Sequence, residues 1–420
     1  MIRDIIKKEK RNRVSKEKSL KTIIPKIRVK NFLEAWTRKK LQSLAPLRGG
    51  FAFKSEKFQN VGIPIVRISN IGFDGTVGGE FEYYSKLNPD EKFVLKGRSL
   101  LLAMSGATTG KIAMLDSEEE YYQNQRVGYF QNNGAVDYDF LSSVLQTKAF
   151  TNQLNAVLVA GAQPNISSKE IDSFEFCIPE SIEEQSAIGT LFRTLDDLLG
   201  SYKDNLANYQ SLKATMLSKM FPKAGQTVPE IHLDGFEGEW EIKRADEIFK
   251  SVSEKNRASL PVLSASQIDG MVLRDEIGID IKYDEATLNN YKVVKPGQFV
   301  IHLRSFQGGF ALSKLEGITS PAYTIIDFID KANNLPDFWN SILTSRDFIK
   351  RLETVTYGIR DGKSISFKDF SSLKFVFPEF KEQQAIGAYF SNLDNLINSH
   401  QEKISQLETL KKKLLKDMFI

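Results

Sequence analysis

Two long segments of the chain carry apolar residues at every seventh position. In the first segment, residues 181–222, the two rows are Ile188, Leu195, Tyr202, Tyr209, Met216 and Phe192, Leu199, Leu206, Met220. In the second, residues 381–420, the matching rows are Ile386, Leu393, His400, Leu407, Leu414 and Phe390, Ile397, Ile404, Met418. Spacing by seven is typical of helices that pair as a coiled coil, and Pro222 marks the end of the first one.

We expect the two helices to pair with each other in antiparallel orientation. Each helix would extend roughly 55–60 Å at about 1.5 Å per residue, which is longer than the face that a small domain offers. The alternative is that each helix packs only on its own globular domain. Lys213 and Lys411 interrupt the second row at the same place in each helix. Such a lysine either fixes the register of the pair or extends into solvent at a frayed helix end.

The chain is an internal repeat. Residues 184–189 (EQSAIG) recur as residues 382–387 (EQQAIG), and the two helical segments stay in register from there to their ends. Residues 25–32 (PKIRVKNF) and 229–236 (PEIHLDGF) each precede a tryptophan by four positions. The predicted plan is a basic, flexible leader at 1–22, a globular domain at 23–180, a helix at 181–222, a second globular domain at 223–380 and a helix at 381–420.

The two globular domains are predicted to be mixed and rich in strands. The expected strands are residues 63–68, 99–104 and 322–326, the expected helices 138–153 and 337–353, and the expected loops 70–75 and 357–363. The fold class is therefore α+β. Two strand-rich domains are separated by two long antiparallel coiled-coil helices, with a pseudo-two-fold internal repeat.

Polar residues on the predicted loops have the side chains that DNA recognition uses. Arginine binds guanine with two hydrogen bonds, asparagine and glutamine bind adenine, and lysine contacts phosphate. The DNA-contact residues predicted in the first domain are Lys54, Arg67, Asn70, Ser105, Thr108, Lys111, Arg126, Gln163 and Asn165. Those predicted in the second domain are Arg304, Ser305, Gln307, Arg360, Lys363 and Ser366. The alternative for each residue is a solvated surface side chain or a turn residue.

Composition allows this interpretation without demanding it. The net charge of the 420 residues is +4, so any DNA-binding surface must come from local clustering of basic residues. The single cysteine, Cys177, excludes an intramolecular disulfide and fits a reducing compartment. The leader has no apolar secretory core, and no apolar stretch is long enough to span a bilayer. We therefore expect a cytoplasmic protein.

The motifs of an enzyme are missing. Residues 106–112 (GATTGKI) resemble a phosphate-binding loop but have too few residues between the glycines, and Ile112 stands where a magnesium-binding hydroxyl is needed. None of the three histidines, His232, His302 and His400, has a metal-ligand spacing. No glycine-rich turn suits a nucleotide or methyl-donor cofactor. We expect a non-catalytic chain without metal or cofactor.

From residue 22 onward, the sequence resembles the specificity (S) subunit of type I restriction-modification systems. The resemblance rests on an ordered, duplicated set of motifs: residues 50–55 (GFAFKS), 62–68 (GIPIVRI), 105–111 (SGATTGK), 178–180 (IPE), 377–379 (FPE) and the two EQ motifs described above. Residues 305–311 (SFQGGFA) depart from the first domain's loop pattern, which puts any transfer of contact residues between the halves in doubt.

The resemblance implies a function and a set of partners. Two target recognition domains would each read half of a split, asymmetric sequence in double-stranded DNA, and the paired helices would set the gap. Two modification subunits would dock on this scaffold and methylate adenine with S-adenosylmethionine. Restriction subunits, where present, would supply ATP- and Mg²⁺-dependent translocation and cleavage for host defence. The competing hypotheses are a structural coiled-coil protein with two non-DNA modules, and a fused standalone methyltransferase or nuclease.

Overall fold

The computed structural model describes residues 24–160, 165–266, 269–277, 285–302, 309–355 and 367–420. The chain divides into two compact units. One comprises the residues up to Lys203 together with Lys403–Ile420, and the other comprises Asp204–Glu402. This division cuts through each long helix instead of setting the helices apart as segments of their own.

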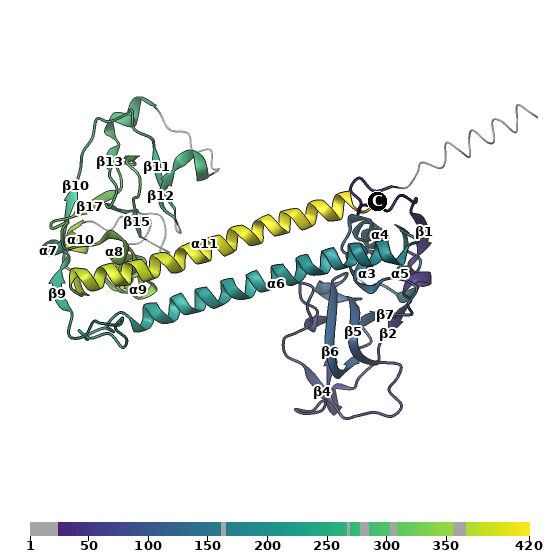
Figure 1. Cartoon of the computed structure of the whole chain (residues 1–420). Coiled ribbons are helices and arrows are strands. Elements are labelled where there is room, and N and C mark those ends of the chain that lie inside the picture. The colour runs from purple at the N-terminus through teal and green to yellow at the C-terminus, as the bar shows by residue number, and fades with distance from the viewer. Residues whose placement is uncertain (1–23, 161–164, 267–268, 278–284, 303–308, 356–366) are drawn as a thin grey trace, which may run out of the picture. The chain divides into compact units, whose positions relative to one another are not determined.

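The first unit combines strands and short helices with one half of each long helix (Figure 1). Its elements are β1 (Thr37–Lys40), α2 (Leu41–Leu44), β2 (Leu47–Gly49), η1 (Ser55–Lys57), β3 (Ile63–Val66), η2 (Ile68–Asn70), β4 (Glu82–Tyr84), β5 (Val94–Ala103), η3 (Gly106–Thr108), β6 (Ile112–Gln123), β7 (Val127–Phe130), α3 (Tyr138–Val144), α4 (Lys148–Ala160), α5 (Ser168–Asp172), β8 (Glu175–Ile178) and the start of α6 (Ile182–Lys219).

Six strands of this unit form one sheet in the order β2-β7-β5-β6-β3-β4. The β3–β6 pair is parallel and the other pairs are antiparallel. On the central strand β5, Leu100 and Leu102 face one buried cluster, whereas Leu101 and Ala103 face another. Because alternate side chains of a strand point to opposite faces, a strand covered on both faces reads as a continuous apolar run.

The second unit repeats the plan with a smaller sheet. Its elements are the end of α6, β9 (Glu241–Arg244), α7 (Ala245–Ile248), β10 (Phe249–Val252), β11 (Leu263–Ser266), β12 (Gly270–Leu273), η4 (Arg274–Ile277), η5 (Glu285–Asn290), β13 (Lys292–Val294), β14 (Phe299–Ile301), β15 (Phe310–Leu312), β16 (Gly317–Thr319), β17 (Thr324–Phe328), α8 (Pro336–Leu343), α9 (Arg346–Val355), α10 (Phe367–Ser371), β18 (Lys374–Phe377) and the start of α11 (Phe380–Asp417), whose last residues belong to the first unit. Four strands pair in the order β10-β17-β14-β15, and three two-stranded pairs complete the described part of the unit.

The predicted antiparallel pairing of the long helices is confirmed. In the first unit, Lys203 of α6 bonds Glu408 of α11 at 2.8 Å, and Asp196 bonds Lys411. In the second unit, the ring of Tyr209 packs against that of His400, with 5.2 Å between the ring centres. Residue numbers therefore rise along one helix as they fall along the other.

The two predicted domain helices were wrong as single helices. Residues 138–153 comprise all of α3 and the first part of α4, with a break at Leu145–Thr147. Residues 337–353 divide in the same way between α8 and α9, with a break at Thr344 and Ser345. Each break contains a hydroxyl that accepts from a backbone N–H of the next helix: Phe150 N donates to Thr147 Oγ1 at 3.4 Å, and Phe348 N donates to Ser345 Oγ at 3.2 Å. Such capping starts a new helix.

Each unit packs a partly buried aromatic residue from the end of one long helix against its core. Phe419, which follows α11, lies 6.1 Å from Trp36, 5.7 Å from Phe140 and 5.7 Å from Phe192, measured between ring centres. Phe221, which follows α6, has the equivalent neighbours in the second unit. It lies 5.9 Å from Trp240, 5.8 Å from Phe338 and 6.0 Å from Phe390. Each core is therefore completed by a residue from the far end of a helix that starts elsewhere in the chain.

Candidate nucleic-acid interface

The repeated EQ motif anchors the start of each long helix to its own domain. In the first unit, the buried carboxylate of Glu184 accepts two hydrogen bonds from Arg28, at 2.6 and 2.8 Å. This interaction raises the pKa of Arg28, and it keeps a buried carboxylate paired. In the second unit, Glu382 is also buried and lies 2.8 Å from His232 Nδ1.

The glutamine and the glycine of the motif are also structural. Gln185 accepts from the backbone N–H of Asp137 at 2.9 Å and donates to Pro179 O at 2.8 Å. Gln383 accepts from Leu335 N and donates to Pro378 O in the same way. A Cβ on Gly189 would lie 2.5 Å from Phe140 N, so only glycine lets α6 approach α3 this closely. The motif is therefore a scaffold element, and DNA contacts must be sought elsewhere.

The seam residues predicted for helix pairing lie where the helices meet each other and the domains. Ile188, Phe192 and Leu195 are buried in the same cluster as the first domain's core. The other buried seam residues are Leu199, Ile386, Phe390, Leu393 and Ile397, whereas Leu206, Ile404 and Leu407 are half-buried. The first turns of each helix thus pack on a domain as well as on the partner helix. Packing on the domain alone, the alternative raised by the sequence, is excluded by the ion pairs between the helices.

Loops of the first domain that are far apart in sequence meet at one end of β5. The Thr108 hydroxyl donates to Ile68 O at 3.2 Å, which joins η3 to η2. Ser105 forms an isolated β-bridge with Asn165. Arg126 Nη1 lies 3.5 Å from Asn165 Oδ1, at the limit of a hydrogen bond. Five of the nine predicted contact residues therefore belong to one group of loops: Arg67, Ser105, Thr108, Arg126 and Asn165.

The loop between η2 and β4 is a tight turn. Asp74 Oδ1 accepts from the Thr76 hydroxyl at 2.8 Å and from the Thr76 N–H at 3.1 Å, and these bonds lower the pKa of Asp74. Gly75 has φ +83°, which a glycine adopts without strain. Gly72 N donates to Thr76 O at 2.9 Å. The turn holds the side chain of Phe73 in solvent with 91% of its surface exposed.

Lys111, also predicted as a DNA contact, lies over this aromatic ring. Its ammonium is stacked on the face of Phe73, in a cation–π interaction. Desolvation lowers the pKa of Lys111. An ammonium and an exposed aromatic ring thus stand side by side next to the group of loops described above.

Three predicted contact residues of the first domain, Asn70, Ser105 and Lys54, do not present an exposed side chain at this group of loops. Asn70 is buried, and its amide is occupied by backbone: Nδ2 donates to Gly78 O and Glu80 O, and Oδ1 accepts from Arg67 N. Asn70 therefore holds the loop together and presents no free group to DNA. Ser105 is buried as well. Lys54 is exposed but directly precedes η1, on a different loop.

The remaining predictions lie outside the described residues. These are Gln163 in the first domain and Arg304, Ser305, Gln307, Arg360, Lys363 and Ser366 in the second. His302 is the last described residue before Arg304, Ser305 and Gln307. Its backbone N–H donates to Gly309 O at 3.0 Å, between strands β14 and β15. Burial lowers the pKa of the His302 imidazole.

Sequence reasoning missed Phe73. Its loop was predicted from the glycines, but the aromatic residue between them was not singled out. The available signal was an apolar ring within the run NIGFDG, residues 70–75, where turn-forming residues leave no core for it to enter. Single exposed apolar residues are common and do not by themselves indicate a binding site. The contact of Phe73 with Lys111 is what distinguishes this residue.

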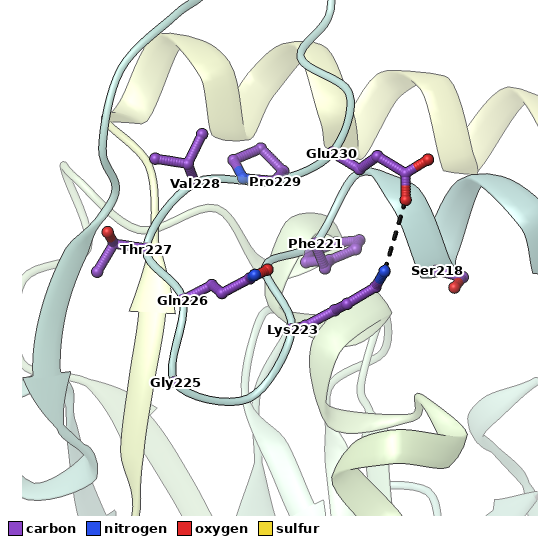
Figure 2. A pocket seen from close by; sticks show the side chains of 9 residues that line it. All are labelled: Ser218, Phe221, Lys223, Gly225, Gln226, Thr227, Val228, Pro229 and Glu230. Carbon is purple, nitrogen blue, oxygen red and sulfur yellow. Dashed lines mark ion pairs between the residues drawn. The ribbon is translucent and has the colours of Figure 1, made fainter.

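A pocket of about 480 Å³ lies at the end of α6 (Figure 2). Its lining runs from Ser218 to Glu230, and Lys223 bonds Glu230 across it at 3.7 Å. Lys219 bonds the same carboxylate at 3.1 Å. The charged residues labelled in Figure 2 therefore neutralise each other and leave no free acid–base pair. The pocket belongs to the junction between helix and domain.

Within the described ranges, no group of three or more histidine, cysteine, aspartate or glutamate side chains could hold a metal ion. A search of the same residues found no helix with the length and apolarity that crossing a membrane requires.

Comparisons with known proteins agree with this picture. Residues 33–208 and 237–409 match the family described as the type I restriction modification DNA specificity domain. The chain is 28% identical over 173 residues to the type I restriction enzyme MjaVIII specificity subunit of Methanocaldococcus jannaschii, in an alignment that covers 40% of each protein. It is 27% identical over 199 residues to the EcoAI specificity subunit of Escherichia coli, covering 45% of this chain and 34% of that protein.

A solved structure shares the fold. The crystal structure of the type I restriction-modification system S subunit from M. genitalium has a TM-score of 0.62 at 16% sequence identity. The match covers 94% of this chain and 99% of the other.

Proposed function

The chain belongs to the type I restriction-modification DNA specificity family, and we propose that its two domains each read one part of a split DNA target. It is a DNA-recognition subunit, and catalysis in this family lies in partner subunits. Because the family repeat occurs twice and the two domains differ, the target is asymmetric. The first domain reads one half-site and the second domain reads the other.

The observation that carries the proposal is the contrast between a constant anchor and variable surfaces. Gln185 and Gly189 make contacts equivalent to those of Gln383 and Gly387, and the neighbouring Glu184 and Glu382 each pair with a basic side chain, Arg28 and His232. Among the described residues, the main sheets of the two domains differ, with six strands in one and four in the other. Selection for one common attachment and two different recognition surfaces explains this pattern, since a specificity subunit must hold two unlike readers in the same way.

The first domain's reading surface is the group of loops around η2 and η3. Arg126 and Asn165 are exposed there and offer guanidinium and amide groups to base edges or phosphates. Lys111 directly precedes β6, whereas the exposed residues Glu118 and Glu119 lie seven and eight positions further along that strand. Acidic side chains repel phosphate, so the DNA approaches at the end of β6 that Lys111 precedes.

Family membership supports a set of partners for this chain. Two modification subunits dock on the helices and domains, bring S-adenosylmethionine and methylate one adenine in each half-site. Restriction subunits, where the system has them, bring ATP and Mg²⁺. Since the substrate is chromosomal or invading DNA and the lone cysteine fits a reducing environment, the complex works in the cytoplasm.

Methylation mapping tests the proposal. The chain is co-expressed with its cognate modification subunit in a methylation-free host, and genomic N6-methyladenine is sequenced. The expected result is one split motif that is absent when this chain is omitted. If a soluble complex forms but this chain changes no methylation, and the purified complex binds no duplex in a salt-dependent manner, the proposal is wrong.

A further inference from the structure

Phe73 combines exposure with rigidity in a way that a core or linker residue does not. Its side chain is 91% exposed. The loop is nevertheless held by the Asp74–Thr76 bonds, by Gly72 N–H donating to Thr76 O, and by a β-bridge between Ile71 and Val77. Exposing an apolar ring to water is unfavourable, and a rigid turn prevents the ring from folding back onto the free protein to reduce this exposure. A binding partner that covers the ring removes that cost without an ordering penalty.

The surroundings of Phe73 favour nucleic acid as that partner. Lys111 lies over the ring, and Thr108, on the same loop as Lys111, donates a hydrogen bond to Ile68 O in η2. The one acidic neighbour in the turn, Asp74, is engaged by the hydroxyl and the N–H of Thr76. An aromatic ring with a cation over one face can stack its other face on a base while the cation contacts the adjoining phosphate.

We propose that Phe73 stacks on, or inserts beside, a base in the first domain's half-site, and that Lys111 contacts the phosphate next to it. This inference rests on the proposed function and deepens it. A base that is to be methylated must leave the helical stack, and an apolar side chain inserted at a base step lowers the cost of unstacking there. Phe73 is thus a positioning residue for the partner's reaction, with no role in the chemical step itself.

The test uses the full chain in complex with its modification subunit. The probe is a duplex that carries the target returned by methylation mapping of the wild-type complex, with 2-aminopurine placed at each position of the first half-site in turn. Unstacking raises the fluorescence of this base analogue. The wild-type complex should raise it at one step, and Phe73→Ala should abolish the rise and weaken binding about 5- to 150-fold. Phe73→Trp should retain both.

Two further variants separate the proposed contacts. Leu33→Ala removes another large apolar side chain, 87% exposed in the same unit, and should leave fluorescence and affinity unchanged. Lys111→Gln should lower the slope of log affinity against log salt by about one, as expected for the loss of one phosphate contact. Circular dichroism melting of each variant establishes that it folds. If Phe73→Ala does not fold, Phe73→Trp still tests the proposal, because it should keep both the fluorescence rise and the affinity of the wild type.

The outcomes are distinct. If the wild-type complex yields no target, the proposed function fails and not merely this inference. If a target exists and Phe73→Ala gives the same fluorescence as the wild type, the inference is overturned whatever happens to affinity. It is equally overturned if Phe73→Ala prevents assembly with the modification subunit, because the ring would then be covered by protein.

Discussion

Lys213 on α6 forms an ion pair with Asp394 on α11 in the second unit, and Lys411 and Asp196 form the equivalent pair in the first unit with the helices exchanged. Both lysines interrupt an otherwise apolar seam. Of the two roles that the sequence left open for them, fixing the register is the one the geometry supports. A lysine meets an aspartate at both places only when the helices run antiparallel in this register.

Reversing one of these charges tests that role. Asp394→Lys places two ammonium groups together and should lower the unfolding free energy by about 1 kcal/mol, a modest amount because the side chains of Lys213 and Asp394 are 30% and 45% exposed. Adding Lys213→Asp restores an opposite pair and should recover most of the loss. Denaturant titration of the single and double variants gives the coupling, and an equally unstable double variant would show that the pair has no register role.

Two glycines of α6 should respond to alanine in opposite directions. Gly189→Ala forces a methyl group against the backbone of Phe140 and should destabilise the first unit by about 1–3 kcal/mol. Gly200→Ala has nothing within 4 Å of the new Cβ. It should stabilise the helix by about 0.5–1 kcal/mol, because alanine has the higher helix propensity. Thermal melting of both variants decides the matter, and a neutral Gly189→Ala would contradict the close approach of α6 and α3.

The two buried carboxylates should differ in their sensitivity to neutralisation. Glu184→Gln leaves the permanently charged Arg28 without its partner and should cost about 3 kcal/mol. Glu382→Gln should cost less, since the imidazole of His232 can stand neutral beside an amide. Unfolding free energies at neutral pH provide the comparison. Equal losses in the two variants would mean that the cation contributes little to the anchor.

The second unit should lose stability in mild acid through His302. Burial lowers the pKa of this imidazole in the folded state, so the unfolded state binds the proton more readily. The stability associated with neutral His302 is therefore fully present above about pH 6.5, the ordinary histidine value, and is lost as the pH falls below it. Relative to His302→Gln, the wild type should melt at progressively lower temperature between about pH 7 and pH 5. A constant difference across that range would contradict the assignment.

The sequence predicted the features that follow from local periodicity and repetition. The rows through Ile188 and Ile386 located both long helices to within three residues. Repetition of the EQ motif showed that the two halves share one plan, as the equivalent contacts of Glu184 and Glu382 illustrate. These features depend on spacing along the chain, and spacing is directly visible in a sequence.

Features that depend on which side chains contact each other in the folded chain were less accessible. Asn70 resembles a DNA-contact residue in sequence, but tertiary hydrogen bonds to Gly78 and Glu80 occupy its amide. The helix breaks near Thr147 and Ser345 replaced a pattern that looked continuous, because a hydroxyl cap competes with helix propagation. The cation–π contact that distinguishes Phe73 comes from Lys111, which is 38 positions away in the chain and so could not be paired with it from the sequence.

The most direct measurement of the central claim is methylation mapping after exchange of one domain. Residues 223–380 are replaced by the corresponding domain of a relative with a different target, and the hybrid is co-expressed with the same modification subunit. The account predicts that the half-site read by the second domain changes while the other half-site is retained. A change in both half-sites, or in neither, would contradict the assignment of one half-site to each domain.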